Sequence, residues 1–356
     1  MIPERFGESA PFSLGVEEEL MILDAETLEQ VGAVDRILRR LDGRELPGRA
    51  KTELFASIVE TNTGVCAGVA EAAEALPELR RAALEAAAAE GLALAAAATH
   101  PFSRPEEQPI VDEERYVTFA GYGGISVRRQ GVQGLHVHVG MPSAEECWRC
   151  LRLIQPWLPV VLALSANSPW FAGELTGMAS NRAPVLAELP RAGGPPPFQT
   201  YAEWEAWVER LIRLGAMEDN TRIWWDVRPH PGFGTLEIRI ADQPTDVGLS
   251  VAFAALVQAL CMAALDGAVA AGGQPGDYEQ NRWAAARFGP RAELLHPDGR
   301  SYLPAAELAA ELLELVRPYA DPAIERIDPS GCEADLQLEA ADAHAAAAAL
   351  VERTLA

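Results

Sequence analysis

The sequence predicts an α+β fold in which helices cover one face of an antiparallel sheet and the other face forms a polar funnel. Two observations lead to this prediction. Strand-like segments fall between residues 12 and 242, whereas residues 246–356 carry mostly helical patterns. The strand-like segments also place polar residues on one face and apolar residues on the other, as in a sheet that packs on helices through one face only. We find no repeat of fixed period and no linker, so we expect one domain over residues 1–356.

The expected strands are identified by alternation and by β-branched residues. Residues 12–23 alternate, and the "DAETLEQV" that follows is typical of a turn and a return. "PGFG" separates two later segments, which indicates a hairpin. The Ala-rich segment after Gly91 is interpreted as a short buried strand that leads into a loop. The expected strands lie within residues 12–23, 52–65, 92–103, 131–140, 221–230 and 234–242.

Helices are expected where propensity or amphipathic spacing is strong. The segment at 143–164 is assigned to one helix despite Pro156 and Pro159. Residues 165–199 are rich in Gly, Pro, Ser and Asn and are expected to form loops. The expected helices cover residues 70–90, 112–122, 143–164, 201–214, 246–270, 304–316 and 334–354.

Charge and cysteine content narrow the class of protein. With 52 acidic against 29 basic residues, the net charge of −23 argues against nucleic-acid and anionic-membrane partners. The five cysteines are scattered, and "CWRC" falls in an expected helix, so buried thiols are favoured over a redox pair. The N-terminus has no apolar signal region, and Glu85, Glu90 and Gly91 interrupt the Ala-rich stretch at 82–98. We therefore expect a reduced, cytoplasmic protein without a membrane-spanning segment.

Several strands carry charged or aromatic residues at every second position, about 7 Å apart on one face. A solvated sheet face is the simplest explanation for any one strand. Such faces are usually Thr, Ser, Lys and Gln, however, and carboxylates that are buried need partners or a cation. Taken together, the strands therefore favour a site, built from Glu17 and Glu19, His136 and His138, Glu237 and Arg239, and the run Arg222, Trp224, Asp226 and Arg228.

Glutamate oxygens with one or two imidazoles form a hard donor set, which suits Mg²⁺ or Mn²⁺ better than structural zinc. A zinc hydrolase usually takes three protein ligands, whereas two or three magnesium ions shared with a polyphosphate need four or five carboxylates. The arginines nearby would then face phosphate or a substrate carboxylate. A P-loop is absent from the sequence, and "GYGG" at 121–124 is interpreted as a turn.

Seven motifs occur in an order that resembles the carboxylate–amine ligases of the bacterial glutamate–cysteine ligase type 2 group, in the glutamine synthetase-like superfamily. The resemblance covers roughly residues 12–290. It implies an antiparallel sheet of about six strands that forms a funnel, open to ATP at one end and to amino acid substrates at the other. The motifs are "GVEEEL", "ELFASIVETNT", "THPFS", "GLHVHVGM", "SANSPWF", "TGMASNR" and "DNTRIWWDVRPHPGFGTLEIRIAD".

The resemblance also implies roles for individual residues. Arg239 would neutralise the transferred phosphoryl group or the tetrahedral adduct, and together with Glu237 and Arg222 it forms the expected catalytic set. Substrate binding is expected from Arg182, Arg222, Asn62 and His138, and nucleotide binding from Arg239 and Arg282. His138 is a less secure metal ligand than His136 and could instead meet phosphate or orient its neighbour. The implied ligands of two or three Mg²⁺ (or Mn²⁺) ions are Glu17, Glu19, Glu53, Glu60, His136 and Glu237.

Glu53 and Glu60 are an odd number of residues apart, so an unbroken strand would place them on opposite faces. We therefore expect a bulge or a strand break near residues 54–57. Glu18 lies on the face opposite Glu17 and Glu19 and is given no metal role.

The expected reaction joins a carboxylate to an amine. The γ-carboxylate of glutamate would attack ATP, giving an acyl phosphate and ADP, and an amine such as cysteine would then displace phosphate. Nothing in the sequence selects the amine, and relatives suggest a homodimer. Two alternatives remain: a metal-dependent amide hydrolase that uses the same Glu and His residues without ATP, and a binding protein that keeps the funnel but has no activity.

Overall fold

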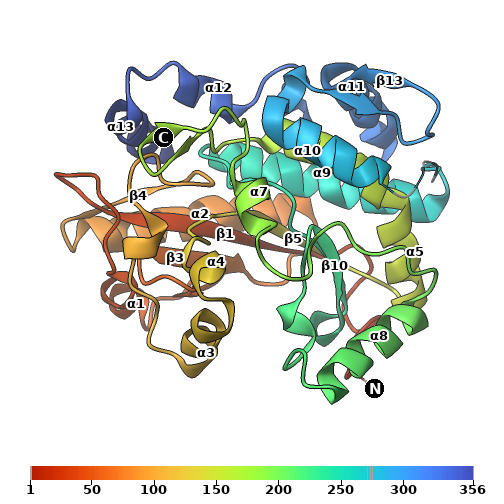
Figure 1. The fold of residues 1–356 in the computed structure, drawn as a ribbon, viewed down its shortest axis with the longest axis horizontal. Coiled ribbons are helices and arrows are strands. Elements are labelled where there is room, and N and C mark those ends of the chain that lie inside the picture. Colours follow the sequence, from red (N-terminus) through yellow and green to blue (C-terminus); the bar gives the residue numbers. More distant parts are fainter. Residues whose placement is uncertain (1, 271, 273, 275, 356) are drawn as a thin grey trace.

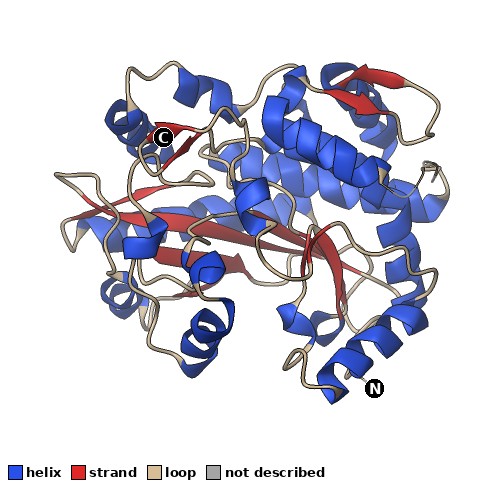
Figure 2. Cartoon of the chain, in the orientation of Figure 1, coloured by secondary structure: helices blue, strands red, loops and turns tan. Residues whose placement is uncertain are grey.

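The computed structural model describes residues 2–270, 272, 274 and 276–355 and is built around one antiparallel sheet (Figures 1 and 2). The strands follow the order β10-β11-β5-β1-β3-β2, and β4 also pairs with β1, which makes seven strands. The α+β prediction is confirmed, and the expected hairpin at "PGFG" is the β10–β11 pair. The strands are β1 (Leu14–Asp24), β2 (Gly48–Thr52), β3 (Ile58–Thr63), β4 (Leu92–Ala95), β5 (Leu135–Gly140), β10 (Val227–His230) and β11 (Thr235–Ile238).

The 11-residue strand β1 organises the sheet because both of its edges are paired. One edge carries β3, with Glu19 opposite Glu60. The other edge carries β5 along its first half, with Glu17 opposite His136, and β4 along its second half. β1 therefore brings residues from four parts of the chain into register.

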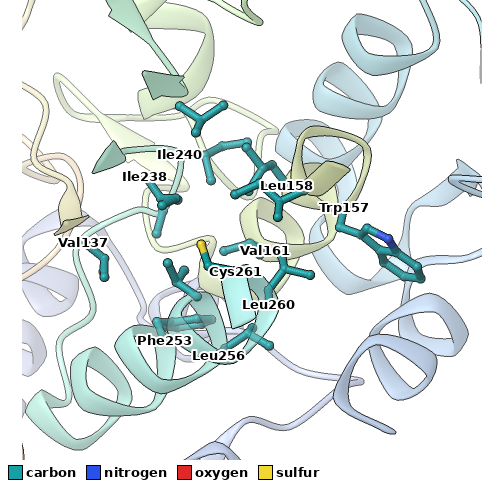
Figure 3. Packing of buried hydrophobic residues seen from close by; sticks show 14 of the residues in the cluster. Val137, Trp157, Leu158, Val161, Ile238, Ile240, Phe253, Leu256, Leu260 and Cys261 are labelled. Carbon is teal, nitrogen blue, oxygen red and sulfur yellow. The ribbon is translucent and has the colours of Figure 1, made fainter. Parts of the chain in front are cut away.

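The apolar face of the sheet packs on helices, as the alternation predicts. Figure 3 shows Val137 of β5 and Ile238 of β11 next to Phe253 and Leu256 of α9 (Val247–Asp266). All four are at most 6% exposed and belong to one large core cluster. Packing of this face fixes the direction of the opposite, polar face.

Helix α9 corrects one expectation. Its 20 residues are long and apolar enough to span a membrane, so the sequence does contain such a stretch. In the structure, 72% of its most apolar window is buried inside the protein, as in a core helix. The side chain of Asp246 accepts a hydrogen bond from Gly248 N at its start, and Gly267 ends it at φ +88°.

The other helices lie around the sheet and α9 (Figure 1). The single helix expected at 143–164 is divided at Gln155–Trp157, because Pro156 has no N–H to continue the hydrogen-bond ladder. The helices are α1 (Val34–Leu41), α2 (Val69–Ala88), α3 (Glu114–Gly123), α4 (Ile125–Arg128), α5 (Ala144–Ile154), α6 (Leu158–Ser165), α7 (Arg182–Leu186), α8 (Tyr201–Arg213), α10 (Asp277–Phe288), α11 (Ala305–Val316), α12 (Glu333–Leu338) and α13 (Ala343–Leu355).

Short strands lie outside the main sheet, and the expected loop region at 165–199 contains several of them. β8 pairs in parallel with β9, which places residues 192–193 beside residues 224–225. The short strands are β6 (Trp170–Phe171), β7 (Glu174–Leu175), β8 (Ala192–Gly193), β9 (Trp224–Trp225), β12 (Glu293–Leu295) and β13 (Tyr302–Pro304).

A cluster of buried polar side chains, Glu18, Arg80 and Gln243, lies on the face of β1 opposite the cavity. Glu18 is fully buried and pairs with Arg80 of α2, whose Nε lies 3.1 Å from its carboxylate. Gln243 Nε2 also donates to Glu18, at 3.1 Å, while Gln243 Oε1 accepts from the backbone N–H of Glu19. This group fixes the backbone of β1 directly beneath the polar face.

We expect Arg80→Leu to lower the free energy of unfolding by ~3–5 kcal/mol, because it leaves the Glu18 carboxylate buried without its cation. Arg81→Leu is the matched control: Arg81 is the next residue of α2 and is exposed, so the change should stay within ~0.5 kcal/mol. Urea unfolding followed by tryptophan fluorescence measures both. Equal losses in the two variants would contradict the role of the pair.

Candidate active site

Strand register gathers the polar side chains into neighbouring rows across the sheet. Glu237 lies opposite both Arg228 and His138, on β10 and β5. The next row joins His136, Glu17 and Asn62. A third joins Glu19, Glu60 and Lys51. Residues far apart in the sequence therefore meet on one face because antiparallel pairing aligns their strands.

This face forms the floor of a cavity of about 550 Å³. One wall is α3, which contributes Arg115, Tyr116 and Phe119, and the segment 218–224 forms another. Of the residues expected at the site, the following line this cavity: Glu17, Glu19, Glu53, Glu60, His136, His138, Arg182, Arg222, Glu237 and Arg239.

One group of possible metal ligands consists of Glu17, His138 and Glu237, whose ligand atoms all lie within 4.8 Å of one another. Arginines balance its negative charge: Arg228 Nε lies 2.6 Å from Glu237, and Arg239 pairs with the same carboxylate. Burial alone would raise the pKa of Glu237, but these two arginines hold it well below the ordinary value. Burial likewise opposes ionisation of Glu17, yet hydrogen bonds with His136 and His138 lower its pKa.

The second group, Glu19, Glu53 and Glu60, meets the same 4.8 Å limit but has much less positive charge around it. Lys51 Nζ lies 2.9 Å from Glu60 and is its ion-pair partner among the described residues. Burial, reinforced by the charge of Glu19, raises the pKa of Glu53 to about 8. Burial, reinforced by Glu17, also raises the pKa of Glu60 well above its ordinary value. Three carboxylates held this closely with one lysine form a donor set that fits a hard divalent cation.

Glu53 reaches this group because the chain breaks where the odd spacing requires it. β2 ends at Thr52 and β3 begins at Ile58, and residues 53–57 form an irregular connection. The N–H of Ile58 donates to Phe55 O across the turn. The expected break near residues 54–57 is therefore confirmed, and Glu53 and Glu60 lie on the same side.

The two histidines both line the cavity but face different sets of carboxylates. The structure groups His138, and not His136, with Glu17 and Glu237. His138 Nε2 lies 3.6 Å from Glu17 and 3.9 Å from Glu237, while its Nδ1 lies 2.9 Å from Thr235 Oγ1. His136 Nδ1 lies 3.3 Å from Glu17 but belongs to neither carboxylate group. His138 thus lies between two carboxylates because β11 pairs beside it and brings Glu237 opposite, whereas His136 stays a predicted ligand beside Glu17.

Backbone groups hold Glu19 in a single orientation. The N–H of Gly134 donates to its carboxylate at 2.6 Å, and its own N–H is held by Gln243. One carboxylate oxygen is therefore fixed by a neutral donor, which leaves the other free to face Glu53 and Glu60.

The remaining predicted residues separate into those at the cavity and those elsewhere. Arg182 is buried, donates to Arg239 O at 2.9 Å and lines the cavity. Arg222 lies at the rim, paired with Glu218. Arg282 does not line the cavity: its Nε lies 2.6 Å from Asp226, and both side chains are buried away from it. The expected nucleotide contact of Arg282 is therefore not supported, because Asp226 already occupies its guanidinium.

Asn62 lines a second cavity of about 430 Å³ that meets the first at Glu17, His138 and Phe233. Its Nδ2 donates to Glu60 at 2.8 Å, and its buried Oδ1 has no hydrogen-bond partner among the described residues. Buried atoms of four residues that line the first cavity also have no partner among the described residues, namely Gln130 Oε1, Arg182 Nε, His230 Nδ1 and Arg239 Nε. Such atoms around one space indicate polar ligands that complete the site.

Sequence reasoning missed several cavity residues. Lys51 received no role, although a hairpin between 48–52 and 58–63 would have placed it opposite Glu60. His230 and Phe233 stack with centroids 4.1 Å apart and both line the first cavity, but His230 was placed only in an expected strand and Phe233 only in the hairpin turn. Residues of α3 gave no signal, because only tertiary packing brings that helix over the sheet.

Metal binding should strengthen as the pH rises. The folded protein holds a proton on Glu53 up to about pH 8, whereas the unfolded chain releases it near 4.5. Without metal, this group's contribution to stability is therefore present below pH 4.5 and is lost as the pH rises through about 8. We expect Mg²⁺ or Mn²⁺ to raise the melting temperature more at about pH 9 than at about pH 6, because the cation replaces this proton.

Glu53→Gln should reduce this pH dependence, measured by thermal unfolding with and without the cation, while Glu60, whose pKa is also raised, keeps part of it. Glu74→Gln, an exposed acid on α2, is the control and should keep it. A metal-induced shift that is the same at both pH values would contradict the assignment.

Comparison with known proteins identifies the family of this chain. A family model for glutamate–cysteine ligase family 2 (GCS2) matches residues 13–334. Two proteins of Rubrobacter xylanophilus, named "Putative glutamate--cysteine ligase 2-3" and "2-1", are each 40% identical to this chain. The alignments cover 94% and 91% of this chain and 89% and 85% of the relatives.

The fold is similar to that of a glutamate–cysteine ligase from Francisella tularensis in complex with AMP, with a TM-score of 0.74 at 14% identity, covering 97% of this chain and 89% of the other. A bifunctional glutathione synthetase from Pasteurella multocida gives 0.65 at 16% identity, over 97% of this chain and 51% of the other. The chain belongs to glutamate–cysteine ligase family 2 and is an ATP-dependent ligase that forms carbon–nitrogen bonds.

Proposed function

We propose that the protein joins the γ-carboxylate of glutamate to an amine through an acyl phosphate, with ATP converted to ADP and phosphate. The observation that carries the proposal is the presence of two clusters of possible metal ligands on one face of the sheet. One cluster is Glu17, His138 and Glu237, and the other is Glu19, Glu53 and Glu60. Arg228 and Arg239 lie beside the first cluster. A site that holds negative ligands near so many carboxylates must also bind cations. This is the charge arrangement that phosphoryl transfer requires.

The two cavities differ in the ligand they suit. The smaller one has apolar walls from Leu14, Val16 and Val65, with Arg49 at its edge, and suits a nucleotide base. The larger one contains most of the arginines and suits the amino acid carboxylates. Glu17 and His138 line both cavities, so the γ-phosphate and the glutamate carboxylate would meet beside them.

The chain's own residues would act mainly by holding charge. An oxygen of the glutamate γ-carboxylate attacks the γ-phosphorus, and the bond to ADP breaks. Arg239, fixed by Glu237, donates to the transferred phosphoryl oxygens. The amine then attacks the acyl carbon and loses a proton as phosphate leaves. Mg²⁺ or Mn²⁺, held by Glu19, Glu53 and Glu60 and by Glu17, His138 and Glu237, would supply the remaining neutralisation.

We expect repeated turnover of ATP to ADP only when glutamate and an amine are both present, because the acyl phosphate is consumed by the amine. With labelled oxygen in the γ-carboxylate, one labelled atom should appear in the released phosphate, because the acyl phosphate transfers it. Mass spectrometry of the phosphate measures this. Metal-dependent amide cleavage without any nucleotide requirement would instead support the hydrolase alternative.

Glu237→Gln should lower turnover by about 10³-fold, because Arg239 and His138 lose the charge that positions them. Glu339→Gln, an exposed acid after α12, is the control and should keep full turnover. Similar activity of Glu237→Gln and the wild type would refute the proposed site.

A further inference from the structure

A third recess of about 380 Å³ lies beside the larger cavity. Phe119, Glu218, Arg222 and Trp224 line both spaces, so the recess continues from the expected amino acid site. Its other walls include apolar side chains of α8 and the segment after it, such as Ile212 and Met217. A recess with apolar walls this close to the reaction favours an apolar part of a substrate.

An aromatic pair forms the boundary between the two spaces. Phe119 and Trp224 stack with centroids 4.9 Å apart and planes inclined by 19°. Tyr122, one turn further along α3, lines the recess while remaining 60% exposed. Aromatic rings that are left partly open next to a cavity offer both apolar area and a stacking surface.

The guanidinium of Arg191 lies over this aromatic surface, and the backbone of Arg191 is in a strained conformation. Arg191 has φ +62°, which is uncommon for a residue with a side chain. Its guanidinium lies 5.8 Å from the Trp224 ring, and its Nε donates to Arg222 O at 2.9 Å. Among the described residues, Arg191 has no acidic partner. Strain of this kind is maintained where a side chain must point in a required direction, and here it leaves a cation available to a carboxylate.

Building on the proposed ligase function, we propose that this recess is the acceptor site and that the acceptor is an α-amino acid with an aromatic or other large apolar side chain. The side chain fills the recess against Tyr122 and Met217, the carboxylate pairs with Arg191, and the amine passes Phe119 into the larger cavity. Glycine and cysteine leave most of the recess unfilled and gain little from it.

The first test compares acceptors by ADP release at saturating ATP and glutamate. Phenylalanine and methionine should exceed glycine and cysteine in kcat/KM by about 10-fold or more, because a filled apolar pocket discriminates by that order. Phenethylamine, which lacks the carboxylate, should fall below phenylalanine. If glycine or cysteine is the best acceptor, the inference is wrong while the ligase function stands. If no amine releases ADP, the proposed function fails, and this inference fails with it.

Variants separate the acceptor site from the rest of the enzyme. Tyr122→Ala and Trp224→Ala should raise KM for phenylalanine by about 10-fold, and Tyr122→Ala, whose residue does not line the larger cavity, should leave KM for ATP and glutamate unchanged. Arg191→Gln should remove the preference for phenylalanine over phenethylamine. Trp283→Ala is the matched control, since Trp283 lies on α10, is 56% exposed and lines none of these spaces. Because Tyr122 is largely exposed, its variant should fold even if Trp224→Ala does not. An unchanged KM for phenylalanine in Tyr122→Ala and an unchanged preference in Arg191→Gln would overturn the proposal.

Discussion

Glu19, Glu53 and Glu60, whose ligand atoms lie within 4.8 Å of one another with Glu53 half-buried and the other two buried, are the constraint on which the rest of the site depends. Removing such charges from water is costly, and mutual repulsion adds to the cost. The chain offsets part of it with Lys51 and with the N–H of Gly134. The remainder is met by a proton on Glu53, whose pKa rises to about 8. The folded protein therefore keeps an excess of negative charge at these three carboxylates, which a divalent cation would neutralise.

The opposite face of β1 must be rigid for this arrangement to hold. Glu18 is tied to Arg80 and Gln243, and Arg80 also donates to Pro244 O at 3.2 Å. The loop that carries Gln243 is held in turn by Glu333 of α12, which accepts from the N–H of Thr245 at 2.7 Å. The C-terminal helices thus support Glu19 through a chain of buried hydrogen bonds, although they contribute no residue to the cavity.

The sequence was sufficient to predict the polar face but not its detailed grouping. Alternation places His136 and His138 on the same face, and it cannot tell which of them stands opposite Glu237. That depends on the β5–β11 register, which residues outside these strands help to set. The break before Glu60 was predictable because an odd spacing is incompatible with one strand. Arg282 was misplaced for the opposite reason: its partner Asp226 lies 56 residues earlier in the chain, and no local pattern indicates the pair.

The two carboxylate groups differ in charge balance, and this difference bears on how the site would accept a phosphate. Glu237 accepts hydrogen bonds from both Arg228 and Arg239, so the two guanidiniums share one negative partner. A cation that took up part of the charge of Glu237 would leave both guanidiniums with more positive potential toward the cavity. If the proposed function holds, electrostatic coupling through one carboxylate would link cation binding at Glu17, His138 and Glu237 to phosphate binding at Arg239. The anion would be held firmly only after the cation is in place.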